Sequence, residues 1–462
     1  MTNGTAMARS LSILNPQPQR LRGPNLLHQL VGYDNDGDNI AIDYEDFRGA
    51  RQSLTYAELR SRSSTLAGRL RAVQSEKSSP TPARFIVPVL IPQSLELYIT
   101  QLAILKAGGA FCPITLDVPE ERLRFILQDV EASVLATTAS VRQNLPLLDG
   151  VHIVAVDDDA SSGNAVLPWT NISPSDPAYI MYTSGSTGQP KGVIISHDAA
   201  TQAFLAHDRH IPTFSRFLQF ASPTFDVSVF EIFFPLFRGS TLVCCDRRKL
   251  LSNLPHIMHS LDIDAAELTP SVVSSLLQGR QSVPSLKVLL TIGEMLKKSV
   301  VEEFGRDAND QSLLYGMYGP TEATIHCTLQ PCFAKDMPVG SIGVPLDTVS
   351  AFILRPPRDE GSNDSNTDIL PLGEEGELAV GGHQLADGYL NREEQTRAVF
   401  VQHPEYGRLY RTGDKARLLP DGKLECLGRM SSGQIKLRGQ VSQCSKFCHS
   451  TITDRLQAHR TW

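Results

Sequence analysis

The chain has 462 residues, of which 41% are hydrophobic and 20% charged, with 33 glycines and a formal net charge of −7. This length allows two to four domains, and the composition is ordinary for a soluble α/β enzyme. The negative charge argues against nucleic acid or an anionic membrane as a partner, and no apolar run reaches the ~20 residues of a membrane span. The eight scattered cysteines and the lack of a signal-peptide core indicate reduced thiols in the cytoplasm.

The expected elements alternate between strands and helices. Residues 1–23 are expected to form a disordered leader. A helical spacing of apolar residues begins at residues 54–59, residues 85–90 suggest a strand, and residues 102–113 suggest a helix ended by glycines and then a short strand. This alternation, which continues to about residue 350, predicts layered α/β folding with largely parallel sheets. Residues 355–368, rich in Pro, Asp, Asn and Ser, are expected to form a mobile surface insertion.

A polar loop between two apolar strands carries the strongest motif. From Tyr182 to Gly192 it reads Tyr-Thr-Ser-Gly-Ser-Thr-Gly-Gln-Pro-Lys-Gly. Glycines let a backbone approach a ligand closely, hydroxyls add donors, and Lys191 supplies the positive charge that polyphosphate oxygens require. An ordinary polar hairpin loop is the alternative. The loop differs from a P-loop, because Pro190-Lys191-Gly192 replaces the Gly-Lys-Ser/Thr of that motif.

This loop resembles the phosphate loop of the adenylate-forming superfamily, which includes acyl-CoA synthetases, luciferases and the adenylation domains of nonribosomal peptide synthetases. The resemblance implies the large N-terminal part of that α/β fold, with layered α/β subdomains and a small β-rich subdomain. It also implies ATP and Mg²⁺ as cofactors. Catalytic roles then pass to Thr187 and Lys191, and nucleotide-binding roles to Thr183, Ser184, Gly185, Ser186 and Gly188.

Two further motifs match the same family. In residues 315–322, a Gly-Pro turn follows an aromatic residue and precedes a carboxylate. The resemblance places Tyr318 and Gly319 at the adenine, Thr321 at the α-phosphate and Glu322 on the metal. In residues 410–414 and 428–429, it gives Asp414 the ribose hydroxyls and Arg429 a ribose or phosphate contact. Gly316 and Cys426 depart from the family, which usually has an asparagine and an aromatic residue there.

Asp226 gives the most information about the substrate. A carboxylate within an apolar run is costly unless it meets a cation or caps a helix, and both readings remain open from the residues alone. In adenylation domains of peptide synthetases this aspartate pairs with the α-ammonium of the substrate, whereas acyl-CoA synthetases have no such need. The resemblance implies that the following residues line the amino-acid pocket: Asp226, Val227, Phe230, Glu267, Leu290, Ile292, Met317, Ile325 and His326. Glu267 indicates a substrate with a side-chain donor or amine, or else pairs with His326.

The resemblance covers roughly residues 50–440. It predicts an AMP-binding domain at 24–429 and a hinge with a divergent tail at 430–462. The tail does not match the family's C-terminal lid domain with its catalytic lysine, and no phosphopantetheine-bearing carrier site is recognised. The function it implies is ATP-dependent adenylation of an amino acid in nonribosomal peptide synthesis, with a carrier domain supplied in trans. A truncated or inactive copy, an acyl-CoA or aryl-acid ligase of the same fold, and a non-catalytic nucleotide-binding remnant are the alternatives.

Overall fold

The computed structural model describes residues 10–33, 37–77, 85–158, 171–184, 189–306, 313–356, 367–430, 434–437 and 440–443. Within these ranges the strands form a 7-stranded sheet, a 15-stranded sheet and a hairpin. The expected insertion at 355–368 falls mostly outside them, as do most residues of the predicted tail.

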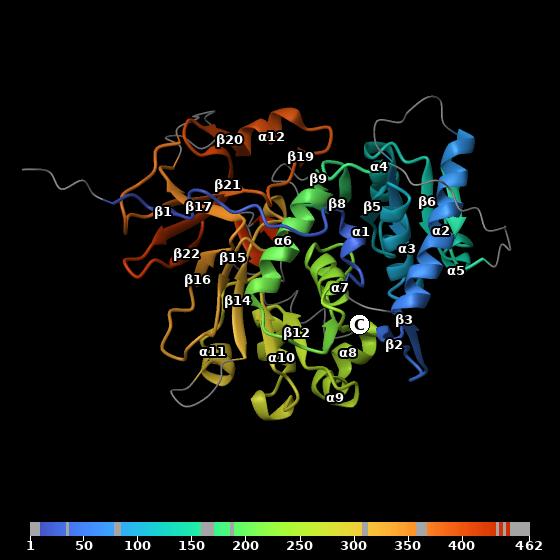
Figure 1. Cartoon of the computed structure of the whole chain (residues 1–462), viewed down its shortest axis with the longest axis horizontal. Helices are drawn as coiled ribbons and strands as arrows, with labels where there is room; N and C mark the ends of the chain where they lie inside the picture. The colour runs from blue at the N-terminus through green and yellow to red at the C-terminus, as the bar shows by residue number, and fades with distance from the viewer. Residues whose placement is uncertain are drawn as a thin grey trace, which may run out of the picture.

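The 7-stranded sheet lies at the right of Figure 1 and is mainly parallel. Its strands, in spatial order, are β19 (Gly388–Tyr389), β9 (Lys191–Ser196), β8 (Pro177–Thr183), β5 (Ala110–Pro113), β4 (Ile86–Leu90), β6 (Val134–Thr137) and β7 (His152–Ala155). The helices of this part of the chain are α2 (Tyr56–Lys77), α3 (Leu95–Lys106), α4 (Glu120–Asp129), α5 (Ala139–Arg142) and α6 (His197–His210). Strands β9 and β19 run antiparallel to their neighbours and end the sheet.

One half of the 15-stranded sheet is an α/β layer whose central strands are parallel. Its strands, in spatial order, are β3 (Arg51–Thr55), β2 (Ile40–Glu45), β11 (Thr241–Cys245), β10 (Arg216–Gln219), β12 (Ala265–Leu268), β13 (Val288–Thr291), β14 (Leu314–Tyr318) and β15 (Thr328–Gln330). The accompanying helical segments are α1 (Leu27–Leu30), α7 (Val227–Phe237), α8 (Arg247–Ser252), α9 (Leu254–Ser260), α10 (Pro270–Leu276), η1 (Arg280–Ser282), α11 (Lys298–Phe304) and η2 (Thr321–Ala323).

The other half is the β-rich subdomain at the left of Figure 1, joined to the α/β layer through the pairing of β15 with β16. It is built from β1 (Ile13–Leu14), β16 (Ser341–Pro345), β17 (Val349–Leu354), β18 (Gly376–Gly382), β20 (Phe400–His403), β21 (Gly407–Leu418) and β22 (Leu424–Arg429), with α12 (Glu393–Val399). After it come β23 (Gln434–Leu437) and β24 (Gln440–Gln443), which pair with each other. The α/β fold with a small β-rich part, predicted from the sequence, is confirmed.

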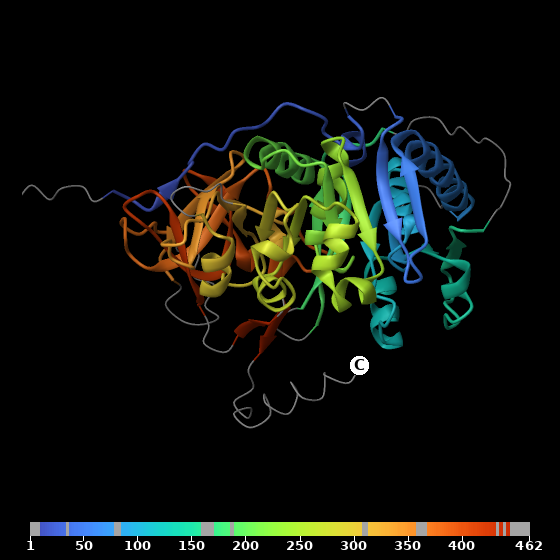
Figure 2. The same cartoon turned by 90° about the horizontal axis from the view of Figure 1, so that it is seen from below.

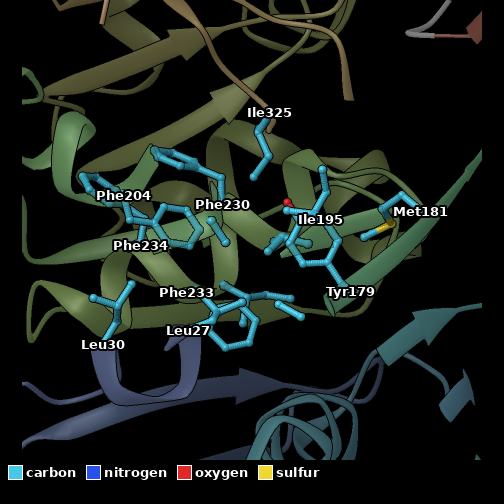
Figure 3. Close-up of a cluster of buried hydrophobic side chains, with 14 of the residues drawn as sticks. Leu27, Leu30, Tyr179, Met181, Ile195, Phe204, Phe230, Phe233, Phe234 and Ile325 are labelled. Carbon is cyan, nitrogen blue, oxygen red and sulfur yellow. The ribbon is translucent and has the colours of Figure 1, made fainter. Parts of the chain in front are cut away.

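Helix α7 joins the two α/β layers. Its sequence, VSVFEIFFPLF, is apolar except for the buried Ser228 and Glu231, as is typical of a helix buried between layers. Phe233 on α7 stacks on Phe111 of β5, with ring centroids 6.1 Å apart, so one hydrophobic core spans both sheets. Figure 3 shows this core, with Phe204, Phe230 and Phe234 gathered on one side.

The prediction of a disordered leader over residues 1–23 is wrong for residues 10–23. Strand β1 pairs with β17, and the Asn15 amide donates to the carbonyl oxygens of Asp347 and Val349 at 3.1 and 2.7 Å. Farther along, the backbone N–H of Leu21 donates to Gln202 of α6 at 2.8 Å. This segment runs across the molecule from the β-rich part to α1, as both whole-chain views show (Figures 1 and 2). Its own apolar content is low, and hydrogen bonds to main-chain carbonyls and to the Gln202 side chain help to hold it in place.

Residues 1–9 lie outside the described part. The helix predicted from residue 54 onward also begins later than expected. Leu54 lies in β3, where it pairs with Ile42 of β2, and α2 starts at Tyr56. No described helix combines the length and apolar character needed to cross a membrane.

Candidate nucleotide and substrate site

The phosphate-loop residues lie at the open end of the β8–β9 hairpin. Thr183 ends β8 directly opposite Lys191, which begins β9, so the two side chains project from the same face of the hairpin. Ser184 follows Thr183 and is described, whereas Gly185, Ser186, Thr187 and Gly188 lie outside the described residues. Their predicted roles stay predictions.

Lys191 and Glu322 lie on the same side of this hairpin. The Lys191 ammonium sits 4.9 Å from the ring centroid of Tyr389, and the Tyr389 hydroxyl donates to Glu322 Oε1 at 2.6 Å. Burial lowers the pKa of Lys191, and the charge of Glu322 acts in the opposite direction. Tyr389 thus contacts both a cation and a carboxylate, through its ring and its hydroxyl respectively.

The residues that the sequence predicts to bind the nucleoside come together at the Asp414 carboxylate. The Tyr318 hydroxyl donates to Asp414 Oδ2 at 2.7 Å, and Arg429 Nη1 donates to Oδ1 at 3.0 Å across the β21–β22 register. A carboxylate has about four acceptor positions, so Asp414 retains capacity for the hydroxyls of a ribose. Gly319 is required next to Tyr318, since a Cβ there would lie 2.2 Å from the carbonyl oxygen of Ile325.

The departure at Gly316 has a local cause. A Cβ at this position would come within 2.9 Å of the Phe333 ring, so a side chain such as asparagine would require Phe333 to move.

Asp226 fulfils the capping role that the sequence left open. It is the N-cap of α7, and its Oδ1 accepts from the backbone N–H of Val227 at 2.9 Å. Burial raises the pKa of Asp226, and a hydrogen bond with the side chain of Thr321 opposes this rise. Capping uses part of the carboxylate, which leaves further acceptor positions for a cation.

The predicted pocket residues converge at the carboxyl ends of adjacent parallel strands, a common place for ligands in α/β sheets. Val227 and Phe230 lie on α7, Glu267 on β12, Leu290 on β13 and Met317 on β14, and Ile292, Ile325 and His326 lie in the loops that follow. All of these but Val227 are buried. Phe230 stacks on Phe234 with centroids 4.6 Å apart (Figure 3).

Backbone strain marks the loop that carries Ile325. This β-branched residue has φ of 71°, in the left-handed region. Such a conformation costs roughly 1–3 kcal/mol and concentrates at functional sites. The neighbouring Thr324 is held there by its hydroxyl, which donates to the carbonyl oxygen of Gln384 at 2.5 Å.

Glu267 and His326 do pair, as one of the sequence alternatives allows. His326 Nε2 lies 2.7 Å from Glu267 Oε1, and His326 Nδ1 lies 3.0 Å from His207 Nε2. Burial raises the pKa of Glu267 far above its usual range and lowers that of His326 to about 3. His207, on α6, is far from the motifs in the sequence, and no pattern pointed to it.

The residues present fit ATP and Mg²⁺. Among the described residues there is no cluster of three or more potential metal ligands. Mg²⁺ in nucleotide enzymes is often held by one or two carboxylates together with phosphate oxygens. Glu322 would supply the carboxylate, and Lys191 lies close enough to share the same phosphates.

Comparison with known proteins agrees with this geometry. The model of the AMP-binding enzyme family matches residues 33–390. Nonribosomal peptide synthetase 2 of Gibberella zeae is 56% identical over 96% of this chain, which covers 9% of that protein. Nonribosomal peptide synthetase SIDC of Beauveria bassiana is 51% identical over 97% of the chain, again 9% of the relative. Siderophore peptide synthetase fer3 of Mycosarcoma maydis is 36% identical over 98%, or 10% of its length.

Solved structures of the nonribosomal peptide synthetase FmoA3 have the same fold. One crystal structure superimposes with a TM-score of 0.75 at 27% identity, over 90% of this chain and 44% of that one. The form bound to α-methyl-L-serine-AMP gives a TM-score of 0.74 at 27% identity, over 89% and 46%. This chain spans about a tenth of the length of its curated relatives. By sequence and fold, it belongs to the AMP-binding enzyme family and corresponds to an adenylation domain of the nonribosomal peptide synthetase type.

Proposed function

We propose that residues 24–429 form an adenylation domain that joins an amino acid carboxylate to the α-phosphate of ATP and releases pyrophosphate. The observation that carries this proposal is the position of Asp226, whose carboxylate lies beside Thr321 and within the electrostatic reach of Glu322. An α-ammonium on Asp226 would thus leave the substrate carboxylate near the phosphate-binding side chains.

The remaining side chains have defined tasks in this reaction. Tyr318, Asp414 and Arg429 hold the nucleoside, and Thr183, Ser184 and Lys191 hold the phosphates with the loop residues Gly185 to Gly188. Thr321 and Thr187 contact the reacting phosphate. Mg²⁺ on Glu322 would neutralise phosphate charge, since positioning and electrostatic stabilisation supply most of such catalysis.

The relatives and the bound neighbours support the substrate class. FmoA3 is known in AMPPNP-bound and α-methyl-L-serine-AMP-bound forms. The curated relatives are named for nonribosomal peptide or siderophore synthesis, so we place this domain in secondary metabolism, with a carrier domain as its partner. We also place it in the cytoplasm, where the described cysteines, all free thiols, would stay reduced.

The test is the substitution Asp226→Asn. The amide oxygen still accepts from the Val227 N–H, so the helix cap survives while the negative charge is lost. We expect amino-acid binding to weaken by about 100-fold, in line with the 1.5–3 kcal/mol of a hydrogen bond to a charged group, and AMPPNP binding to stay unchanged. Both are measured by isothermal titration calorimetry.

An acyl-CoA or aryl-acid ligase gives the opposite pattern. It would bind a carboxylic acid lacking the α-amino group at least as well as the amino acid, and Asp226→Asn would leave that affinity unchanged. That outcome would contradict an amino acid as the substrate and would still agree with an adenylate-forming reaction.

A further inference from the structure

A chain of three hydrogen bonds lies behind the amino-acid pocket. Its members are the Ala203 carbonyl, His207, His326 and Glu267, and its successive contacts measure 2.5, 3.0 and 2.7 Å. Glu267, His207 and His326 are buried to within 1% of complete exclusion from solvent. The chain thus connects helix α6 to the end of strand β12 through the loop after η2.

The direction of these bonds is fixed at one end. A carbonyl oxygen only accepts, so Nδ1 of His207 donates to Ala203. In a neutral His207 the other nitrogen, Nε2, is an acceptor, which requires a proton on Nδ1 of His326. Nε2 of a neutral His326 is then an acceptor as well, and the proton of its bond to Glu267 belongs to the carboxylic acid.

Any other placement of protons that makes all three hydrogen bonds shifts this proton from one member of the chain to another, and the total number of protons stays the same. The group therefore holds one proton more than a carboxylate with two neutral imidazoles, and its net charge is zero. Placing a proton on the acid agrees with the raised pKa of Glu267 and the lowered pKa values of His326 and His207.

The second oxygen of the carboxyl group has no partner among the described residues. Glu267 Oε2 is buried and makes no hydrogen bond, and the buried hydroxyl of Tyr179 makes none either. The negative charge of Asp226 helps to raise the pKa of both groups. A buried polar group without a partner destabilises a fold, so two such groups within the electrostatic reach of Asp226 indicate a site that a polar ligand completes.

We propose that Glu267 Oε2 accepts a hydrogen bond from the substrate side chain, and that the domain selects an α-amino acid whose side chain carries an uncharged hydrogen-bond donor. This inference rests on the proposed function, in which Asp226 holds the α-ammonium. Apolar side chains would leave Oε2 unsatisfied. A side-chain ammonium would meet a group with no net charge, walled by Phe230, Leu290 and Met317, and would lose its hydration without a counter-charge.

His207 and His326 act as positioning residues in this scheme. Together they turn the acid proton of Glu267 away from the pocket, so that the oxygen facing the ligand is the acceptor.

The test uses non-hydrolysable aminoacyl-sulfamoyl-adenosines in matched pairs on the 462-residue protein. Seryl, threonyl, asparaginyl and glutaminyl analogues are compared with alanyl, valyl, leucyl and methionyl analogues of similar shape, and the lysyl analogue supplies a cation. Dissociation constants come from calorimetry. We expect the best donor-bearing analogue to bind at least about 100-fold tighter than its apolar partner and than the lysyl analogue, because sites built to hydrogen-bond a substrate discriminate strongly.

Two variants identify Glu267 as the origin of this preference. In Glu267→Gln the amide NH₂ replaces the acid proton toward His326 and the amide oxygen stays an acceptor, so the preference should survive within about tenfold. Glu267→Leu should abolish it. If the leucine variant does not fold, the wild-type panel and the glutamine variant still decide the matter.

Three results would overturn the inference: equal binding within the pairs, tightest binding of the lysyl analogue, or loss of the preference in Glu267→Gln. A protein that binds neither AMPPNP nor any analogue contradicts the proposed function itself, and AMPPNP is titrated first for that reason.

Discussion

Lys191 is a half-buried cation whose protein environment disfavours its charge. Burial lowers its pKa, and the Tyr389 ring and Glu322 compensate only in part. A nucleotide phosphate is the stronger counter-charge. The side chain therefore contributes to binding far more than to folding.

We expect Lys191→Ala to weaken AMPPNP binding by about 10–100-fold, which corresponds to the loss of one charged hydrogen bond. The melting temperature without nucleotide should change little. Lys298→Ala on α11 is the matched control, because that side chain is 83% exposed and pairs with Glu302 in the adjacent turn. A large drop in melting temperature for Lys191→Ala, but not for Lys298→Ala, would show that Lys191 stabilises the fold.

Tyr389 is a positioning residue for Glu322. Its hydroxyl is a hydrogen-bond donor to the carboxylate, while its ring lies under Lys191, and these two functions separate in Tyr389→Phe. Loss of an outer hydrogen bond to a metal ligand typically costs 10–100-fold in metal affinity. We expect the Mg²⁺ concentration for half-maximal AMPPNP binding to rise by about that factor.

AMPPNP affinity in EDTA supplies the discriminating readout for Tyr389→Phe, since it should match the wild type. An equal loss with and without Mg²⁺ would show that the hydroxyl supports the fold and does not orient a metal ligand. Tyr406→Phe, at the turn between β20 and β21, controls for the loss of a phenol elsewhere in the same subdomain.

Sequence reasoning found the residues that stand in motifs and missed those that support them. Glu322 and Asp414 follow tight turns in recognisable motifs, whereas His207 lies in the last turn of α6, 119 positions from its partner His326. Contacts of that separation are set by how helices pack on sheets, and a single sequence holds no local sign of them. For Asp226 the sequence left two roles open, a partner for a cation and a helix cap, and only the structure shows that it caps α7.

At the scale of elements, Asn15 makes several of the hydrogen bonds that attach the N-terminal segment. Asn15 has φ of 47° and directs its amide at carbonyl groups before and within β17. Asparagine tolerates this left-handed conformation better than most residues. The segment packs few apolar side chains, so its amide bonds are a large part of its attachment.

We expect Asn15→Ala to reduce the free energy of unfolding by about 1–3 kcal/mol, from lost hydrogen bonds and left-handed strain. Asn15→Gly removes the amide but tolerates the backbone conformation, so it separates the two causes. Urea titrations measure both. Wild-type stability in both variants would show that the Asn15 amide contributes nothing to the stability of the fold.

The sequence predicted elements best where apolar runs were continuous. β8 and β9 lie where their runs predict them, and β4 begins one residue late. The polar, hydrogen-bonded attachment of residues 10–23 leaves no such pattern, which explains the wrong prediction of disorder. The same limit applies to the start of α2, where Leu54 satisfies a helical spacing but pairs in β3.

At the scale of the whole molecule, the two sheets share one core, and histidines that are buried or partly buried lie in or beside it. Burial lowers the pKa of His28 and His326 to about 3 and that of His197 to about 4. His197 joins two elements directly, because its Nδ1 accepts from the backbone N–H of Leu27 in α1 at 3.0 Å. The contact between α1 and α6 therefore requires a neutral imidazole.

This contact makes the stability of the fold pH-dependent. The folded pKa of His197, about 4, lies below the ordinary value of 6.5, so between these values the unfolded chain binds a proton that the folded chain does not. The stabilisation is present above pH 6.5 and is lost as the pH falls toward 4. A shift of this size corresponds to about 3 kcal/mol for the one group.

His197→Asn tests this, because the asparagine oxygen can accept the Leu27 N–H and the side chain cannot titrate. We expect the variant to be less stable than the wild type at pH 7, since the packed ring is lost, and the difference to shrink or reverse by up to about 3 kcal/mol at pH 4. His256→Asn, at an exposed position on α9, controls for the removal of a histidine. Urea titrations at half-unit steps of pH supply the curves. Parallel curves for His197→Asn and the wild type would mean that His197 does not titrate differently in the folded and unfolded chain, and that the acid sensitivity of the fold arises elsewhere.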